Sequence, residues 1–109
     1  MASEGSKSVV DFKYLEDFAA GDMRVVTEVL ALFRDQAQAW ADKLATSDAG
    51  WQDTVHTIKG SARGVGAFAL GEAAQRAEEL GPSVLTLVRG ELQAAVADIE
   101  GYLTRVGGG

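Results

Sequence analysis

His56 is the single histidine of this chain, and basic and small residues surround it at helical spacing. Lys59, Gly60 and Arg63 follow it by three, four and seven positions. In a helix of about 3.6 residues per turn, these offsets place the side chains on one side. Gln52 extends that side by one turn towards the N-terminus. This face is basic on a chain whose formal charge is −6, so it is the first candidate for a functional site.

The residue types on this face suit an exposed nucleophile. An imidazole has a pKa near 6.5, so at neutral pH one ring nitrogen has a lone pair available for attack. Attack on a phosphoryl group would bring about −2 of charge to the ring, and Lys59 lies within reach to neutralise part of it. Gly60 costs the helix about 1 kcal/mol relative to alanine but leaves room beside the imidazole. The residues alone leave open that His56 is an ordinary solvated side chain.

Several other chemistries are excluded by composition. Cysteine is absent and histidine occurs once, which excludes disulfides, thiolate catalysis, multi-histidine zinc sites and bis-histidine haem within one chain. The acidic residues show no EF-hand spacing, and neither GxxxxGK[ST] nor GxGxxG occurs. Ser61 lacks a second histidine as base, and a mid-helix serine usually bonds to its own turn. We therefore expect no metal, cofactor or nucleotide site.

The apolar pattern predicts an all-α fold. A short helix is expected at about Asp11–Ala20, with Phe12, Leu15 and Phe18 at helical spacing. Four longer apolar stripes follow, from Val26 to Leu44, from Trp51 to Val65, from Leu70 to Leu80, and from Leu85 to Val106. The last of them includes Leu103. Amphipathic helices joined by short links most simply form an antiparallel up-down-up-down four-helix bundle, with the short helix capping one end.

The connections between these helices contain typical capping and breaking residues. Gly21 is expected to end the first helix, and Asp22 is a good N-cap for the second. Residues 46–50 interrupt the pattern before the third helix, and Gly81, Pro82 and Ser83 separate the last two. Trp40 and Trp51 lie on apolar stripes and are expected in the core.

Length and charge describe one soluble domain. The chain has 109 residues, of which 47% are hydrophobic and 24% charged. We expect a single domain at 9–106, a flexible N-terminus at 1–8 and a flexible glycine tail at 107–109. No apolar run approaches the ~20 residues that cross a bilayer, and no signal peptide is visible, so we expect a cytoplasmic protein. The acidic surface disfavours nucleic acid and anionic membranes as partners.

The run HTIKGSARGVGA at 56–67 resembles the signature of histidine-containing phosphotransfer (HPt) domains. The pattern is His, any residue, an apolar residue, Lys, Gly, Ser, a small residue, and a Gly-Ala pair ten residues after the histidine. LEDFAAGD at 15–22 is similar to the family's first helix and the Gly-Asp that follows it. The later helices fall in register, so the resemblance spans most of the chain. Gly64 departs from the family, in which Asn or another polar residue is frequent at this position.

The resemblance implies three catalytic residues. His56 would accept a phosphoryl group from the phospho-aspartate of a receiver domain and pass it to another receiver, with electrostatic help from Lys59. An antiparallel fourth helix returns to the level of His56, and in this family the residue 22 positions on bonds the second ring nitrogen. Here that residue is Glu78, whose carboxylate would leave Nε2 as the nucleophile. Gln75, one turn earlier, is the reserve candidate.

The resemblance also implies the partners. Receiver domains and a sensor histidine kinase, often a hybrid one, would be the partners, and the docking surface would include Gln52, Gly60, Arg63 and Gln75. The chain would be a monomeric phosphocarrier without autokinase activity, and the receiver would supply the divalent metal. The alternative is a non-catalytic helical adaptor that binds receiver domains without being phosphorylated. The dimerisation domain of a sensor kinase is disfavoured, because Thr57 stands where that class usually has Glu or Asp.

Overall fold

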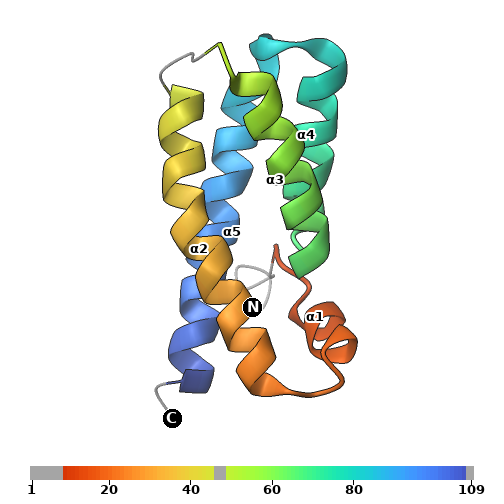
Figure 1. Ribbon diagram of the computed structural model, residues 1–109, viewed down its shortest axis with the longest axis vertical. Coiled ribbons are helices and arrows are strands. Elements are labelled where there is room, and N and C mark those ends of the chain that lie inside the picture. The colour runs from red at the N-terminus through yellow and green to blue at the C-terminus, as the bar shows by residue number, and fades with distance from the viewer. Residues whose placement is uncertain (1–8, 46–48, 108–109) are drawn as a thin grey trace, which may run out of the picture.

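Four helices lie side by side in an antiparallel bundle, and a fifth helix of seven residues lies at one end (Figure 1). The computed structural model describes residues 9–45 and 49–107. Its helices are α1 (Phe12–Phe18), α2 (Met23–Ala45), α3 (Trp51–Val65), α4 (Phe68–Leu80) and α5 (Leu85–Gly107), with a 3-10 turn, η2 (Pro82–Val84), before α5. The predicted all-α, up-down-up-down bundle is confirmed.

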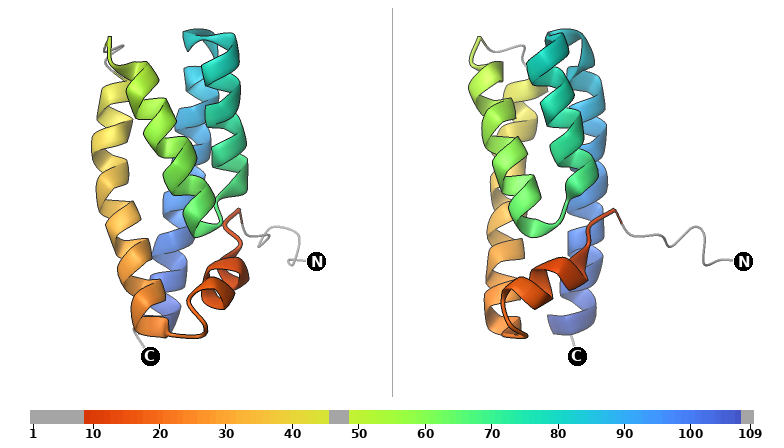
Figure 2. Two further views of the ribbon diagram at one scale, coloured as in Figure 1. Left: turned by 45° about the vertical axis from the view of Figure 1, so that its right-hand side comes forward. Right: turned by 90° about the vertical axis from the view of Figure 1, so that its right-hand side faces the viewer.

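The bundle has two long and two short helices, which explains the place of α1. Helices α2 and α5 have 23 residues each, whereas α3 has 15 and α4 has 13. Figure 2 shows α1 beneath the turn between α3 and α4, beside the lower ends of α2 and α5. The short helix therefore covers the end of the core that α3 and α4 do not reach.

Capping residues set the start of α1 and α2. The Asp11 side chain accepts a hydrogen bond from the Tyr14 amide at 3.0 Å, so Asp11 is the cap of α1 and not its first residue. Ala20 and Gly21 have positive φ and turn the chain towards α2. Asp22 Oδ1 then accepts from the Arg24 amide at 3.1 Å, as expected for a cap.

The turn between α3 and α4 depends on Gly66. This residue ends α3 in the left-handed region at φ 93°. A Cβ on Gly66 would lie 2.5 Å from the backbone oxygen of Asp11, whose own amide donates to the Gly66 carbonyl at 2.9 Å. The glycine therefore both reverses the chain and lets the segment before α1 pack against the turn.

The stripes of α2 and α3 form the core largely as predicted, and the helix ends differ. All six stripe residues of α2 are buried, Trp40 among them, whereas Trp51 at the first position of α3 is only partly buried. Phe18 and Leu80 are 79% and 63% exposed, and each is the last residue of its helix.

The stripe of α5 also takes a different path at its C-terminal end. Tyr102 is buried in place of the expected Leu103, which is only partly buried, and Val106 is exposed. The ring of Tyr102 stacks on Phe12 of α1 with centroids 4.2 Å apart. The final turns of α5 therefore pack against α1 and not along the line of the upper stripe.

The segments that flank the predicted domain at 9–106 fall largely outside the described residues. Helix α5 continues through Gly107, the first residue of the expected glycine tail. The rest of that tail, the expected flexible segment 1–8 and residues 46–48 of the linker lie outside the described ranges. Within those ranges, no helix combines the length and apolar character needed to cross a membrane.

Candidate functional site

The residues singled out by the sequence meet along the seam between α3 and α4. The Gly66 turn brings α4 back antiparallel to α3, and small buried residues, Ala62 on α3 and Ala74 and Ala77 on α4, let the two helices pack closely. His56 and Lys59 of α3 thereby come within hydrogen-bond distance of Glu78 on α4.

The Glu78 carboxylate has a separate partner on each oxygen. His56 Nδ1 lies 2.8 Å from Oε2, and Lys59 Nζ donates to Oε1 at 2.5 Å. The side chain of His56 is 74% exposed, whereas those of Lys59 and Glu78 are 18% and 25% exposed. The imidazole of His56 thus projects into solvent, whereas the side chains of Lys59 and Glu78 beside it are largely shielded.

The charge of Glu78 determines which ring nitrogen carries the proton. The hydrogen bond from Lys59, followed by that from His56, lowers the pKa of Glu78 below its ordinary value of 4.5, despite an opposing effect of desolvation. An ionised carboxylate only accepts hydrogen bonds, so the proton must lie on Nδ1. A neutral His56 then keeps its lone pair on Nε2, the nitrogen on the far side of the ring from Glu78.

Gly60 leaves an open surface beside the histidine. It is exposed on α3, and an added Cβ would have no atom within 4 Å apart from its own helix neighbourhood. Gly64, one turn further, is equally open. Packing within the chain therefore does not require a glycine at either position, although each weakens the helix by about 1 kcal/mol relative to alanine.

Gln75 does not hold the imidazole but bridges two charged groups one turn away from Glu78. Its Oε1 accepts from Arg63 Nη2 at 3.2 Å, and its Nε2 donates to Glu79 Oε2 at 2.7 Å. Gly71 gives the Arg63 side chain room, since a Cβ there would lie 3.0 Å from Arg63 Cγ. His56 therefore donates its hydrogen bond to Glu78 and not to the reserve candidate Gln75.

The rest of the expected docking surface is exposed around His56. Gln52 is exposed one turn before the histidine, and Arg63 is exposed seven residues after it. Leu32 of α2 was not among the predicted surface residues; it is 58% exposed and lines a shallow 240 Å³ groove with Ser61 and Gly64. A signal was available, because Leu32 is a large apolar residue that lies between the stripe residues Leu30 and Phe33 and is not part of the stripe.

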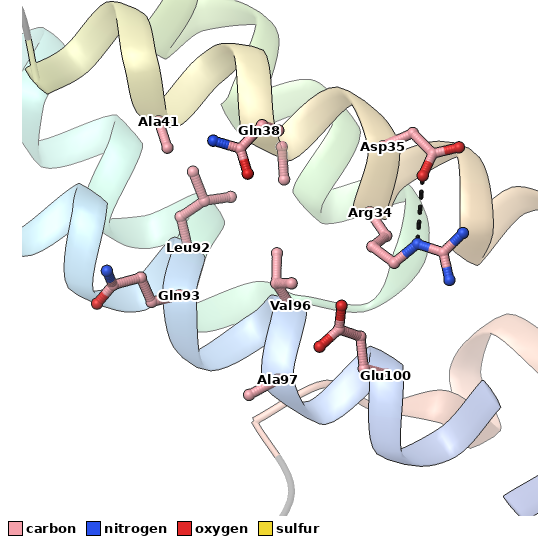
Figure 3. A pocket seen from close by; sticks show the side chains of 10 residues that line it. Arg34, Asp35, Gln38, Ala41, Leu92, Gln93, Val96, Ala97 and Glu100 are labelled. Carbon is pink, nitrogen blue, oxygen red and sulfur yellow. Dashed lines mark hydrogen bonds and ion pairs between the residues drawn. The ribbon is translucent and has the colours of Figure 1, made fainter. Parts of the chain in front are cut away.

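A larger groove of 610 Å³ lies between α2 and α5, and it offers no comparable chemistry (Figure 3). Arg34 Nε donates to Asp35 Oδ1 at 3.2 Å at its rim, and alanines and amides make up much of its lining. No histidine, serine or threonine lines it. In the described part of the chain, no cluster of three or more histidine or acidic side chains is arranged to hold a metal ion.

Comparisons with known proteins find a family model and a solved structure to which this chain is similar. The family model described as Hpt domain matches residues 25–107. The crystal structure of the histidine phosphotransferase ShpA from Caulobacter crescentus is similar to this chain, with a TM-score of 0.82 and 52% sequence identity. The match covers 92% of this chain and 95% of that one. A search of curated protein sequences finds no significant match.

Proposed function

We propose, from the premise that this chain belongs to the Hpt domain family, that His56 carries a phosphoryl group between receiver domains. Family membership and the likeness to a histidine phosphotransferase support a role in a phosphorelay. The finer proposal is that Nε2 of His56 takes the group from a receiver phospho-aspartate and passes it to the aspartate of another receiver.

One observation carries this proposal: the ionised carboxylate of Glu78 accepts a hydrogen bond from Nδ1–H of His56, while the opposite side of the ring is exposed. In the transfer, the Nε2 lone pair forms a bond to phosphorus and the bond from phosphorus to the aspartate oxygen breaks. The electron pair leaves on the receiver carboxylate, and the ring gains a positive charge. Glu78, at 2.8 Å from Nδ1, partly balances that charge.

The surface around His56 suits a large partner that must bring its own phosphoryl group. Gly60 admits the partner to the imidazole, while Gln52, Arg63 and Gln75 supply polar contacts at its edge. The exposed Leu32 and the groove beside Gly64 add an apolar contact on the α2 side. A receiver domain that covers this face would exclude water from the reacting atoms.

We expect no autokinase activity, no cofactor and no metal of its own, so the receiver provides the divalent cation and a sensor kinase, often a hybrid one, begins the relay. The protein acts as a monomer in the cytoplasm. Each of these points is testable separately from the transfer to His56.

Transfer of a ³²P label from a phosphorylated receiver tests the proposal. The wild-type protein should acquire label that is lost in acid and kept in base, the behaviour of a phosphohistidine. His56→Gln should fold normally and acquire none, because the amide has no nucleophilic nitrogen. Label on the Gln variant would refute the assignment, and receiver binding without any label on the wild type would establish the adaptor alternative.

A further inference from the structure

Residues 9–18, which we call the N-terminal clasp, comprise α1 and the three residues before it. Asp98 on α5 accepts hydrogen bonds from the amides of Val9 at 2.9 Å and Val10 at 3.0 Å, both on the same oxygen, Oδ2. The side chain of Val10 is buried, with 1% of its surface exposed. A single carboxylate oxygen of α5 therefore holds two successive amides of the clasp.

Two further contacts hold the clasp at the end of the bundle where α1 lies beneath the turn between α3 and α4 (Figure 2). The Tyr102 hydroxyl, one turn further along α5, donates to Glu16 of α1 at 2.5 Å. The Asp11 amide donates to the carbonyl of Gly66 in the turn at 2.9 Å. The clasp therefore runs from α5 to the α3–α4 turn and is fastened at each side.

The core of the four-helix bundle does not depend on the clasp. Val10 and Leu15 are the buried residues of the clasp, whereas the buried residues of α2 to α5 pack largely on one another. Helix α1 has seven residues, and an isolated helix shorter than about 12–15 residues is marginal in water. Loss of its contacts should therefore unfold α1 and leave the bundle folded, and a segment of this kind opens at a lower free energy than the whole protein.

We propose that the N-terminal clasp opens and closes as one unit on an intact four-helix bundle, and that Asp98 is the residue that keeps it closed. Opening uncovers the apolar surface beneath Val10 and Leu15. His56 precedes Gly66 by ten residues, which places it about 15 Å further along α3. The clasp is thus a strap that exposes one end of the bundle while the His56 site stays formed.

Native-state amide hydrogen exchange tests this proposal. The reporter amides are those of Asp11 and Ala19, which donate to backbone carbonyls and so keep their acceptors when Asp98 is replaced. In the wild type, the protection factors of the reporter amides should be roughly a hundredfold lower than those of Leu30 and Leu92 in the bundle core, because the clasp opens without global unfolding.

Variants of the clasp and of the bundle separate local opening from global unfolding. Asp98→Ala should lower the protection of the reporter amides by roughly tenfold, and Asp98→Asn, which keeps an acceptor oxygen, by less. Ile58→Val weakens the core equally in the closed and open states. It should lower the protection of Leu30 and Leu92 by roughly fivefold and leave the reporter amides unchanged. Glu100→Ala removes an exposed carboxylate from the α2 side of α5, and as the matched control it should not affect the reporter amides.

Two results would overturn this inference. In one, Ile58→Val lowers the protection of the reporter and core amides equally, since the clasp and the bundle then unfold together. In the other, Asp98→Ala leaves the reporter amides unchanged. If Asp98→Ala fails to fold by circular dichroism, Asp98→Asn is measured in its place and must still lower their protection.

The ring signals of His56 provide a second readout. They should be the same in Asp98→Ala and in the wild type, and a change in them would contradict the separation of the clasp from the site. None of these measurements requires phosphoryl transfer, so a failure of the clasp proposal is distinguishable from a failure of the proposed function.

Discussion

Two glutamates of this protein make very short hydrogen bonds, and only one of them adjoins a reactive group. Glu78 accepts from Lys59 at 2.5 Å and bonds His56 at 2.8 Å on the α3–α4 seam, whereas Glu16 accepts from the Tyr102 hydroxyl at 2.5 Å where α1 meets α5. Tyr102 is buried, and burial followed by its bond to Glu16 raises the pKa of Tyr102 to about 12.

The two hydrogen bonds differ in whether the donor side chain has a second polar atom that solvent can reach. The Tyr102 hydroxyl is its only polar group, and its ring is stacked on Phe12, so the bond to Glu16 does no more than fasten α1 to the bundle. The imidazole has a second nitrogen opposite the one that bonds Glu78, and that nitrogen faces solvent. A charged hydrogen bond becomes part of a reactive site only where its donor has a second functional atom that a partner can reach.

The largest effect should come from closing the approach to His56. Gly60→Leu places a side chain in open space one turn from the imidazole, so transfer from a receiver should fall by roughly a hundredfold or more. The free energy of unfolding should hold or rise by about 1 kcal/mol, because leucine favours the helix. Transfer rates and thermal unfolding of the same variant measure both effects.

Gly90→Leu is the matched control for this variant. Gly90 is also an exposed glycine within a helix, with no atom within 4 Å of an added Cβ, but it lies on α5. Its replacement should stabilise the protein to a similar degree and leave transfer unchanged. Wild-type transfer by Gly60→Leu would show that the open surface beside His56 is not the docking approach.

Removal of the carboxylate from the seam should have an intermediate effect. Glu78→Ala should slow transfer by roughly tenfold, a barrier change of about 1.4 kcal/mol, and not abolish it, because water can accept the Nδ1 proton. Glu78→Gln keeps an acceptor oxygen and should lie between the alanine variant and the wild type. Single-turnover transfer rates measure the series.

The counterpart Glu16→Gln sharpens the comparison between the two glutamates. It changes the carboxylate that bonds Tyr102, far from the imidazole in the fold, and should leave the transfer rate within about twofold of wild type. Equal rates for wild type and Glu78→Ala would mean that Glu78 is only a structural partner of Lys59.

The contact between α1 and α5 should affect stability alone. Tyr102→Phe keeps the stacked ring but leaves Glu16, which is partly exposed, to be solvated by water. The free energy of unfolding should fall by about 1 kcal/mol, and the melting temperature by about 4–8 °C for a domain of this size. Transfer by the folded protein should not change, and a loss of transfer at a temperature where the variant remains folded would contradict the separation of the two regions.

The smallest effect concerns how the ion pair between Glu78 and Lys59 changes the stability of the fold with pH. The pKa of Glu78 is lowered in the folded protein, so its ion pair with Lys59 stabilises the fold above the ordinary glutamate value of 4.5 and is lost as the pH falls through the lower folded value. A ¹³C titration of the Glu78 carboxyl should therefore have its midpoint below 4.5, and Lys59→Met should raise that midpoint. Identical midpoints in the two proteins would show that Lys59 does not hold the charge of Glu78.

Periodicity in the sequence predicts the middle of each helix better than its ends. The α2 stripe from Val26 to Leu44 is buried throughout, because a neighbouring helix faces each of its turns. Phe18 and Leu80 fit their stripes equally well but lie at helix ends, where no neighbour covers them. At the end of α5, spacings of three and four residues from Ile99 were both available, and the contact with Phe12 of α1 selects Tyr102.

The candidate site was predictable where it depends on helix geometry. The face that holds His56 follows from spacing within α3, and the meeting with Glu78 follows from an antiparallel return 22 residues later. The direction of the Lys59 side chain was not predictable, because it depends on which acceptor α4 presents to a flexible chain. Leu32, by contrast, was predictable as an exposed apolar residue, because it lies off the buried stripe of α2.

The most direct test of the account is the position of the phosphoryl group on the imidazole. After transfer from a phosphorylated receiver, ¹⁵N and ³¹P NMR of the protein labelled in its single histidine identifies the nitrogen bonded to phosphorus. The account predicts phosphorus on Nε2 of His56, with Nδ1 still hydrogen-bonded to Glu78. Phosphorus on Nδ1, or on any residue other than His56, would contradict it.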